Sequence, residues 1–168
     1  MTLTVRQYAP SDLEACRSLW SELTQRHRDI YDDQTIGGDE PGLAFDSHLQ
    51  KPDLAGTWIA EQGEKVVAFA SLLADGGEGE IDPIVVRPDL RAQGIGTVLL
   101  HLVIDEAKRR GIGSLSIRPV ARNVEAMALY HELGFRTLGH IDMFMELGAG
   151  SARTWKHGIE IHGRDYTY

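Results

Sequence analysis

The chain has 168 residues, of which 42% are hydrophobic and 25% are charged, a composition typical of a single globular domain. Its net charge of −8 argues against nucleic acid as a routine partner, and no apolar run is long enough to span a membrane. The first residues contain no apolar signal core, and Cys16, the single cysteine, cannot form an internal disulfide. These features favour a cytoplasmic protein.

The first elements are read from periodicity. Alternation of apolar and polar residues predicts a strand over residues 3–8. A helix is expected to follow, with Ser11 as its N-cap and Glu14 completing a capping box. Cys16 falls in the apolar stripe of this helix, so it is expected to be a small core residue.

The segment after this helix is strongly acidic. Residues 29–40 contain no Lys or Arg, and two interpretations stay open: a solvated loop, or a mouth that attracts cationic substrates. A short helix over residues 42–50 and a hairpin of two strands, 55–61 and 65–74, are expected next. The acidic residues of the segment are Asp29, Asp32, Asp33, Asp39 and Glu40.

Residues 80–97 contain the strongest local signal. Residues 80–86 are apolar and β-branched enough for a buried strand, and Pro88 and Asp89 end it. A helix begins immediately after a glycine-containing turn and ends with cations in its last turn and a glycine just beyond. Its apolar face consists of Ile95, Val98, Leu99, Leu102 and Val103.

The turn between this strand and helix has the chemistry of a phosphate cradle. Gly94 and Gly96 let the backbone approach a ligand, and the first N–H groups of the helix favour an anion. The pattern lacks the third glycine of a dinucleotide-binding fingerprint and the Gly-Lys-Ser/Thr of a Walker loop. The alternative is an ordinary glycine-containing turn.

The second half continues with alternating elements. A strand over residues 114–117 follows a crossover helix and should lie parallel to the strand at 80–86. A helix is expected from Asn123, its N-cap, to Gly134, its C′ glycine. Two further strands are expected at 135–138 and 141–147.

The domain is expected to span residues 1–147, followed by a C-terminal extension over 148–168 that begins with a flexible joint at 148–151. Residues 159–162 alternate as a half-buried strand would, and a strand needs a sheet edge. The edge can belong to the same subunit or to a partner, and a partner's edge would give a homodimer with exchanged tails.

Together these residues resemble the GNAT superfamily of acyl-CoA N-acyltransferases. The family's Arg/Gln-x-x-Gly-x-Gly/Ala motif is matched by Arg91, Gly94 and Gly96. Its Asn-x-x-Ala-x-x-x-Tyr…Leu-Gly-Phe segment is matched by Asn123, Ala126, Tyr130, Leu133, Gly134 and Phe135. The resemblance covers residues 3–147 and implies an α/β fold with a mixed, mostly antiparallel central sheet. This sheet splays between the fourth and fifth strands and is flanked by helices.

The resemblance implies acetyl-CoA as cosubstrate and no metal. The pantetheine is then expected along the backbone of Ile84, Val85 and Val86, with Asn123 reaching its side. The pyrophosphate is expected on the turn that contains Arg91, Ala92, Gln93, Gly94, Ile95, Gly96 and Thr97. An amide-rich chain can add to an open strand edge as a peptide does.

Tyr130 stands where the family places the proton donor for the leaving thiolate; the alternative is an aromatic core residue. Glu80 or Asp82, two residues apart on one strand face, is the candidate base, and the alternative is a carboxylate at an exposed strand end. Members that acetylate ribosomal-protein N-termini have a glutamate at the position of Arg118, which disfavours that substrate.

These expectations predict an acetyl-CoA-dependent N-acetyltransferase that acts on a primary amine. The acidic segment would favour an amine that carries a positive charge. Attack would occur directly in a ternary complex. Two alternatives stay open: a non-catalytic acyl-CoA-binding regulatory module, and an acyltransferase that uses another acyl-CoA. If Arg118 lies near the acyl group, its positive charge would suit an acidic acyl group.

Overall fold

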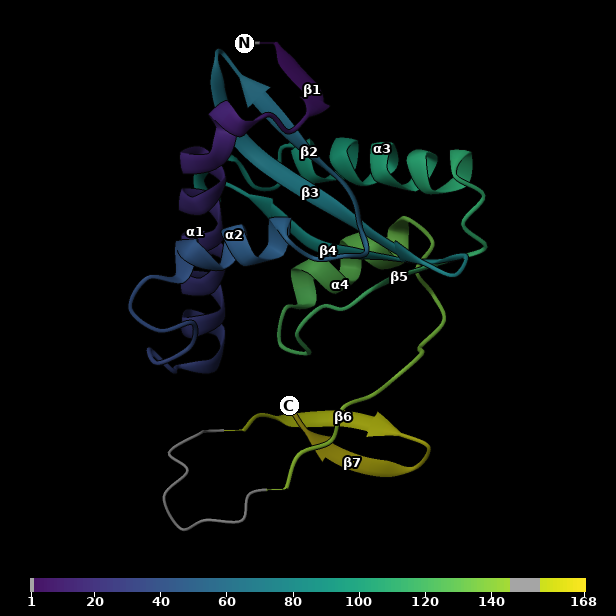
Figure 1. The fold of residues 1–168 in the computed structure, drawn as a ribbon. Coiled ribbons are helices and arrows are strands. Elements are labelled where there is room, and N and C mark those ends of the chain that lie inside the picture. Colours follow the sequence, from purple (N-terminus) through teal and green to yellow (C-terminus); the bar gives the residue numbers. More distant parts are fainter. Residues whose placement is uncertain (1, 146–154) are drawn as a thin grey trace. The chain divides into compact units, whose positions relative to one another are not determined.

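A computed structural model describes residues 2–145 and 155–168. The chain forms two compact units, of which the first comprises Met1–Arg26 with Gly37–Arg118 and the second His27–Ile36 with Pro119–Tyr168. The first unit contains a five-stranded sheet in the order β1-β2-β3-β4-β5 (Figure 1). Its strands are β1 (Leu3–Gln7), β2 (Leu54–Gln62), β3 (Lys65–Asp75), β4 (Glu78–Val86) and β5 (Ser114–Ile117).

The helices lie close to their predicted positions. Three short 3-10 helices precede α1, α2 and α3, where Pro10, Pro41 and Pro88 set the first turn. Every helix of residues 2–145 and 155–168 is too short or too polar to cross a lipid bilayer. The helices are η1 (Pro10–Asp12), α1 (Leu13–Tyr31), η2 (Pro41–Leu43), α2 (Ala44–Leu49), η3 (Pro88–Leu90), α3 (Ile95–Arg109) and α4 (Val124–Glu132).

The core of the first unit lies on both faces of the sheet. On one face Cys16 and Leu19 of α1 and Phe45 of α2 pack against the sheet, and Cys16 is a buried core residue as predicted. The sheet residues in this cluster are Ile59, Phe69 and Val85. The strand residues that alternate with Ile59 and Phe69 point to the other face and are also buried. Helix α3 packs against β2, β3 and β4. The sheet is therefore covered by helices on both sides, which fixes the position of β4.

The pairing of β4 changes partway along the strand. Its parallel pairing with β5 begins at Glu78 and ends at Ile81, opposite Ile117. On its other side the antiparallel register with β3 shifts between Ile81 and Ile84, so an extra residue is accommodated around Pro83. A proline has no N–H to donate and an extra residue bends a strand. The expected mixed sheet with β4 and β5 parallel is confirmed, and β4 continues beyond the end of β5.

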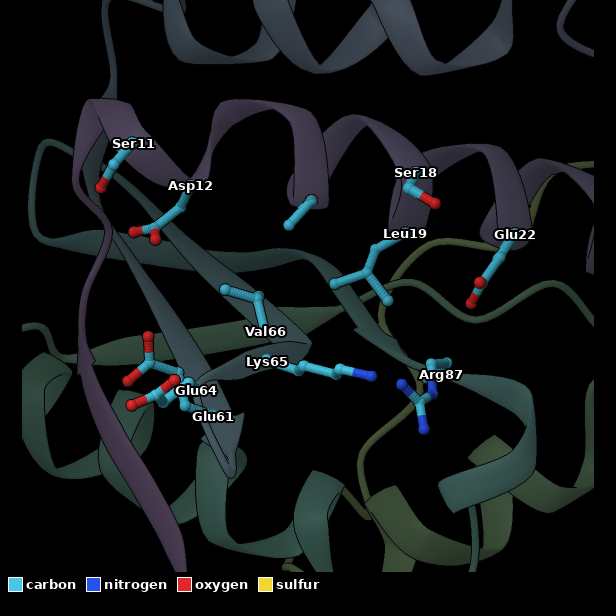
Figure 2. A pocket seen from close by; sticks show the side chains of 11 residues that line it. Ser11, Asp12, Ser18, Leu19, Glu22, Glu61, Glu64, Lys65, Val66 and Arg87 are labelled. Carbon is cyan, nitrogen blue, oxygen red and sulfur yellow. The ribbon is translucent and has the colours of Figure 1, made fainter.

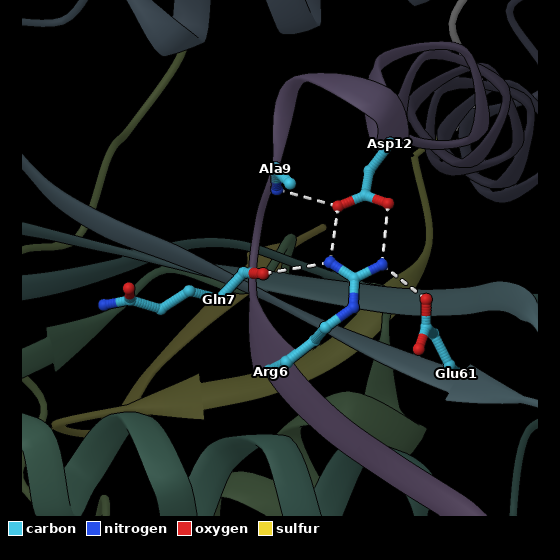
Figure 3. A network of polar contacts seen from close by, with 5 residues as sticks. All are labelled: Arg6, Gln7, Ala9, Asp12 and Glu61. Carbon is cyan, nitrogen blue, oxygen red and sulfur yellow. Dashed lines mark hydrogen bonds and ion pairs between the residues drawn. The ribbon is translucent and has the colours of Figure 1, made fainter.

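The start of α1 differs from the predicted capping box. The Asp12 carboxylate, not Ser11, accepts a hydrogen bond from the Ala9 N–H at 2.8 Å. It also forms a two-pronged ion pair with Arg6, at 2.7 and 2.8 Å, and Arg6 in turn contacts Glu61 of β2 (Figure 3). This ion pair lowers the pKa of Asp12. The prediction for Ser11 was wrong because β1 and β2 bring two distant side chains to the helix start.

In the second unit, Arg122 joins three segments. Its Nε donates to the Tyr168 backbone oxygen at 2.7 Å and its Nη1 to the Ile30 carbonyl at 3.3 Å. The guanidinium also lies over the Tyr31 ring, 5.1 Å from the centroid, and over the Trp155 ring at 5.6 Å. The end of α1, the segment before α4 and the C-terminal hairpin thus share one cationic anchor.

The C-terminal strand prediction is confirmed in part. Strand β6 (His157–Ile161) pairs antiparallel with β7 (Arg164–Thr167), so the tail supplies the edge that its own strand needs (Figure 1). The exchanged-tail homodimer stays a prediction. The proposed boundary between residues 147 and 148 and the joint at 148–151 lie outside the described residues.

The prediction of strands at 135–138 and 141–147 was wrong over the described residues 135–145, which follow an irregular path. Their large apolar side chains are mostly exposed, with Leu138 at 74%, Met143 at 73% and Met145 at 82%. Apolar alternation marks a segment that can become a strand, but a neighbouring strand must supply its hydrogen bonds.

Candidate active site

Two carboxylates lie on β4 at alternate positions. Glu80 and Asp82 are both partly exposed, whereas the neighbouring Ile81 and Pro83 are buried. Among the described residues, each carboxylate has one cationic partner. The Lys51 Nζ lies 2.7 Å from Asp82 Oδ2, and the Arg118 Nε lies 3.3 Å from Glu80 Oε1. The structure therefore brings the two predicted base candidates together on one strand and adds two cations to them.

The same strand has the edge predicted to bind pantetheine. Ile84, Val85 and Val86 pair with β3 on one side, and no described strand pairs with them on the other, because β5 stops at Ile117. The Val85 side chain is buried in the core, so only its backbone groups are available to a ligand. Ile84 and Val86 are partly exposed.

The turn after β4 presents a helix N-terminus. Gly94 is the N-cap of α3 with φ of +83°, and no side chain caps this end of the helix. Ala92 also has a positive φ, +57°. A Cβ atom added at Gly94 would meet nothing within 4 Å, so the space outside the turn is open. The unpartnered N–H groups and the helix dipole give this opening the properties of an anion site, and a diphosphate fits it.

Side chains of the predicted motif hold the turn rather than extend from it. The Arg91 Nε donates to the Val86 carbonyl at 3.1 Å, and the Gln93 Nε2 donates to the Asp89 carbonyl at 3.2 Å. The arginine thereby ties the turn to the end of β4. These contacts favour a role in which Arg91 and Gln93 fix the backbone that meets a ligand. Ile95 is buried and anchors α3, while Gly96 and Thr97 occupy its first turn.

The remaining two predicted site residues belong to α4 in the second unit. Asn123 is the N-cap as predicted, and its side-chain oxygen accepts from the Ala126 N–H at 3.3 Å. Its amide N–H groups remain as donors. Burial raises the pKa of Tyr130 to about 12, so its hydroxyl stays protonated at neutral pH. Its ring meets Phe135 edge-on, with centroids 6.3 Å apart.

The sequence did not single out His48, which lies in α2, or Lys51, which follows α2. His48 is only 2% exposed, and in the described part of the chain neither of its ring nitrogens has a hydrogen-bond partner. It packs against Trp20, with ring centroids 5.3 Å apart. Burial lowers its pKa to about 4, so the ring is neutral at pH 7. The only sequence signal for these two residues is their close spacing, which places them about one helical turn apart. Both are far from β4 in the sequence.

Comparison with known proteins places this geometry in a family. The sequence profile of the acetyltransferase (GNAT) family matches residues 14–135. The [ribosomal protein bS18]-alanine N-acetyltransferase of Escherichia coli (strain K12) is 40% identical over 74 residues, which are 44% of this chain and 50% of that protein. The chain thus spans about half the length of the curated relatives it matches.

Solved structures agree on the fold. The ribosomal-protein-S18-alanine N-acetyltransferase from Escherichia coli has a TM-score of 0.62 at 26% identity, covering 79% of this chain and 77% of that one. Glucosamine-6-phosphate N-acetyltransferase from Arabidopsis thaliana has a TM-score of 0.63 at 18% identity, covering 88% and 100%. The matched region includes β4, the glycine turn, α3 and α4, so the chain belongs to the acetyltransferase (GNAT) family.

Proposed function

We propose that this protein transfers an acetyl group from acetyl-CoA to the nitrogen of a primary amine. The observation that carries the proposal is the succession along one strand of two carboxylates, an unpaired edge and an open helix N-terminus. Acetyl-CoA, when bound, supplies a thioester carbonyl that an amine can attack. The carboxylate end of β4 would face the acetyl group and the Gly94 turn would hold the diphosphate.

The residues of this chain would then manage two protons. A lysine-like amine has a pKa near 10.4, so deprotonating it at pH 7 costs about 4–5 kcal/mol. Glu80, directly or through a water, accepts the proton of the amine as the nitrogen–carbon bond forms. As the carbon–sulfur bond breaks, the Tyr130 hydroxyl donates a proton or hydrogen bond to the leaving thiolate. The high pKa of Tyr130 keeps that proton in place beforehand.

The acceptor is proposed to be cationic. Residues 29–40 contain five acidic side chains and no basic one. One of them, Asp33, accepts from the Thr35 N–H at 3.0 Å and hydroxyl at 2.6 Å, and so turns toward its own loop. Asp32 is therefore the better choice for a test. Changing Asp32→Asn should reduce kcat/KM for a cationic amine, and added salt should reduce it in the wild type as well.

A cytoplasmic location is proposed with this activity, from the single buried cysteine and the cosubstrate. Arg118 is the residue that would pair with an acidic acyl group. Its guanidinium is already paired with Glu80, so acetyl is proposed instead. The relatives compared above are named for different acceptors, an alanine of a ribosomal protein and glucosamine 6-phosphate, so the fold leaves the acceptor open.

The test is a thiol-release assay with acetyl-CoA and a panel of primary amines, including polyamines, aminoglycosides, amino acids and N-terminal peptides. The expected result is turnover of at least one amine, with mass spectrometry showing one added acetyl group. Binding of acetyl-CoA without turnover of any amine would instead support the acyl-CoA-binding regulatory module.

A further inference from the structure

We propose that a hollow between α1 and the β2–β3 hairpin binds a free amino acid with a small apolar side chain. The hollow lies entirely within the first unit and has a volume of about 450 Å³ (Figure 2). Ligand pockets of proteins generally have volumes of this order and a few polar groups that fix the ligand. Binding there would be independent of the acetyl-transfer chemistry.

The side of the hollow formed by α1 has an unsatisfied acceptor. The Glu22 Oε2 atom is buried and has no hydrogen-bond partner among residues 2–145 and 155–168. Figure 2 shows the Glu22 carboxyl pointing from α1 toward Arg87. Desolvation raises the pKa of this carboxyl, with the charges of Arg87 and Arg91 opposing the rise. A buried carboxylate oxygen without a donor is costly, and the ammonium group of a ligand would satisfy it.

The opposite side has cations. Lys65 reaches from the hairpin in the direction of Arg87 (Figure 2), and among the described residues it forms no ion pair. Arg87 donates to both oxygens of Asp89, at 2.6 and 2.9 Å, so this ion pair fixes its guanidinium and offsets its charge. The charge offered to a ligand on this side therefore comes mainly from Lys65. A ligand carboxylate placed between these groups would be paired by Lys65 and would lie opposite the Glu22 side.

The wall has three other carboxylates, of which Glu64 is exposed to solvent and the remaining two are already paired. Asp12 and Glu61 are both bound by Arg6, which neutralises that end of the hollow (Figure 3). Glu22 therefore remains as the buried acceptor, and one ammonium group satisfies it. Leu19 and Val66 line the hollow between the charged groups, which suits a small apolar side chain. A zwitterion with an apolar substituent is complementary to this arrangement.

The hollow is separate from the proposed acetyl-transfer end of β4. Arg87 follows Asp82 by five residues along an extended strand. At about 3.3 Å per residue, that is on the order of 17 Å. An amino acid in the hollow would therefore not lie at the carboxylates of β4, and variants at the two places can distinguish the sites.

The test is calorimetric titration of the full chain, without acetyl-CoA, with L-alanine, L-valine and L-leucine. At least one should bind saturably with a Kd of about 1 mM or tighter. Its amide, which lacks the carboxylate, and its N-acetyl derivative, which lacks the cation, should each bind about tenfold more weakly or worse. Because acetyl-CoA is absent, failure here is distinct from failure of the proposed transferase activity.

Two variants and two controls complete the design. Glu22→Gln and Lys65→Met should each weaken binding by about tenfold or more. Glu14→Gln, on the exposed side of α1 with its carboxylate at Arg17, and Asp82→Asn, in the middle of β4 with its carboxylate at Lys51, should leave it unchanged. Absence of saturable binding, unchanged binding in folded Glu22→Gln, or loss of binding in Asp82→Asn would each overturn the proposal.

Discussion

The Arg118 guanidinium lies 3.3 Å from the Glu80 carboxylate, with Arg118 73% exposed and Glu80 21% exposed. An ion pair this open to solvent contributes about 0–1 kcal/mol to stability. Its larger consequence is electrostatic, because the Arg118 charge offsets the negative charge of Glu80, the carboxylate proposed to meet the amine. The proposed base thus has a neighbour that opposes cationic acceptors.

Replacing Arg118 with Gln should therefore lower KM for a cationic amine by a few-fold, because a repulsive charge is removed. The unfolding temperature should stay close to that of the wild type. Steady-state kinetics with a cationic and a neutral acceptor measure this, since only the cationic acceptor should respond. A KM that rises for the cationic acceptor would show that Arg118 contributes to binding instead.

Glu80→Gln and Asp82→Asn should differ in their effects on turnover. Asp82 is held by Lys51 at 2.7 Å, whereas Glu80 has one longer contact, so Glu80 has more freedom to accept a proton. Glu80→Gln should lower kcat by about 10²-fold or more and Asp82→Asn by less than about tenfold. The reverse ranking, in rapid-quench measurements of the chemical step, would assign the base to Asp82.

Tyr130→Phe should lower kcat by about 10²-fold with little change in the Kd for acetyl-CoA, because the lost hydroxyl acts only on the leaving thiolate. The ring remains, so its edge-on contact with Phe135 is preserved. Single-turnover kinetics and calorimetry measure the two quantities separately. Equal single-turnover rates for the two proteins would make Tyr130 a packing residue.

The parts predicted correctly from sequence depend on local patterns. Strand β4, the turn at Gly94 and helix α3 follow one another within residues 78–109, and alternation, glycines and helix periodicity determine them. Asn123 was identified as the α4 N-cap for the same reason. A local pattern is also what located both halves of the family motif.

The parts that were missed depend on distant contacts. Lys51 reaches Asp82 across 31 residues, and Arg6 joins Asp12 at the helix start to Glu61 because β1 lies beside β2. The same limit explains the irregular residues 135–145, whose apolar pattern predicted strands although strand formation needs a neighbouring strand. Sequence periodicity indicates which residues can pair, and the fold determines with what they pair.

His48 should make the protein sensitive to acid. Burial lowers its pKa in the folded state to about 4, with the Lys51 charge acting in the same direction and Asp82 and Asp53 against it. In the unfolded state the pKa is near 6.5, so the unfolded chain binds more protons between these values. The contribution of His48 is therefore complete above about pH 6.5 and falls as the pH drops toward 4.

His48→Phe, which retains a ring beside Trp20, should flatten this dependence. From pH 7.5 to pH 5, the free energy of unfolding of the wild type should fall by about 2 kcal/mol more than that of the variant. Urea unfolding at the two pH values measures the difference. His27, whose pKa burial also lowers, is present in both proteins and cancels. Parallel pH dependences would show that the pKa of His48 is not lowered in the folded state.

The central claim, that the Gly94 turn binds the diphosphate of acetyl-CoA, can be tested with one matched pair of variants. Gly94 and Gly111 flank the two ends of α3, have similar positive φ values of +83° and +74°, and both face open space. A glutamate at either position imposes the same kind of backbone strain, but only at Gly94 does it place negative charge at the helix N-terminus.

The decisive measurement is the Kd of acetyl-CoA, by calorimetry, for wild type, Gly94→Glu and Gly111→Glu, each shown to be folded by circular dichroism. The account predicts near wild-type affinity for Gly111→Glu and a loss of about 10²-fold or more for Gly94→Glu. Wild-type affinity in a folded Gly94→Glu protein would contradict it.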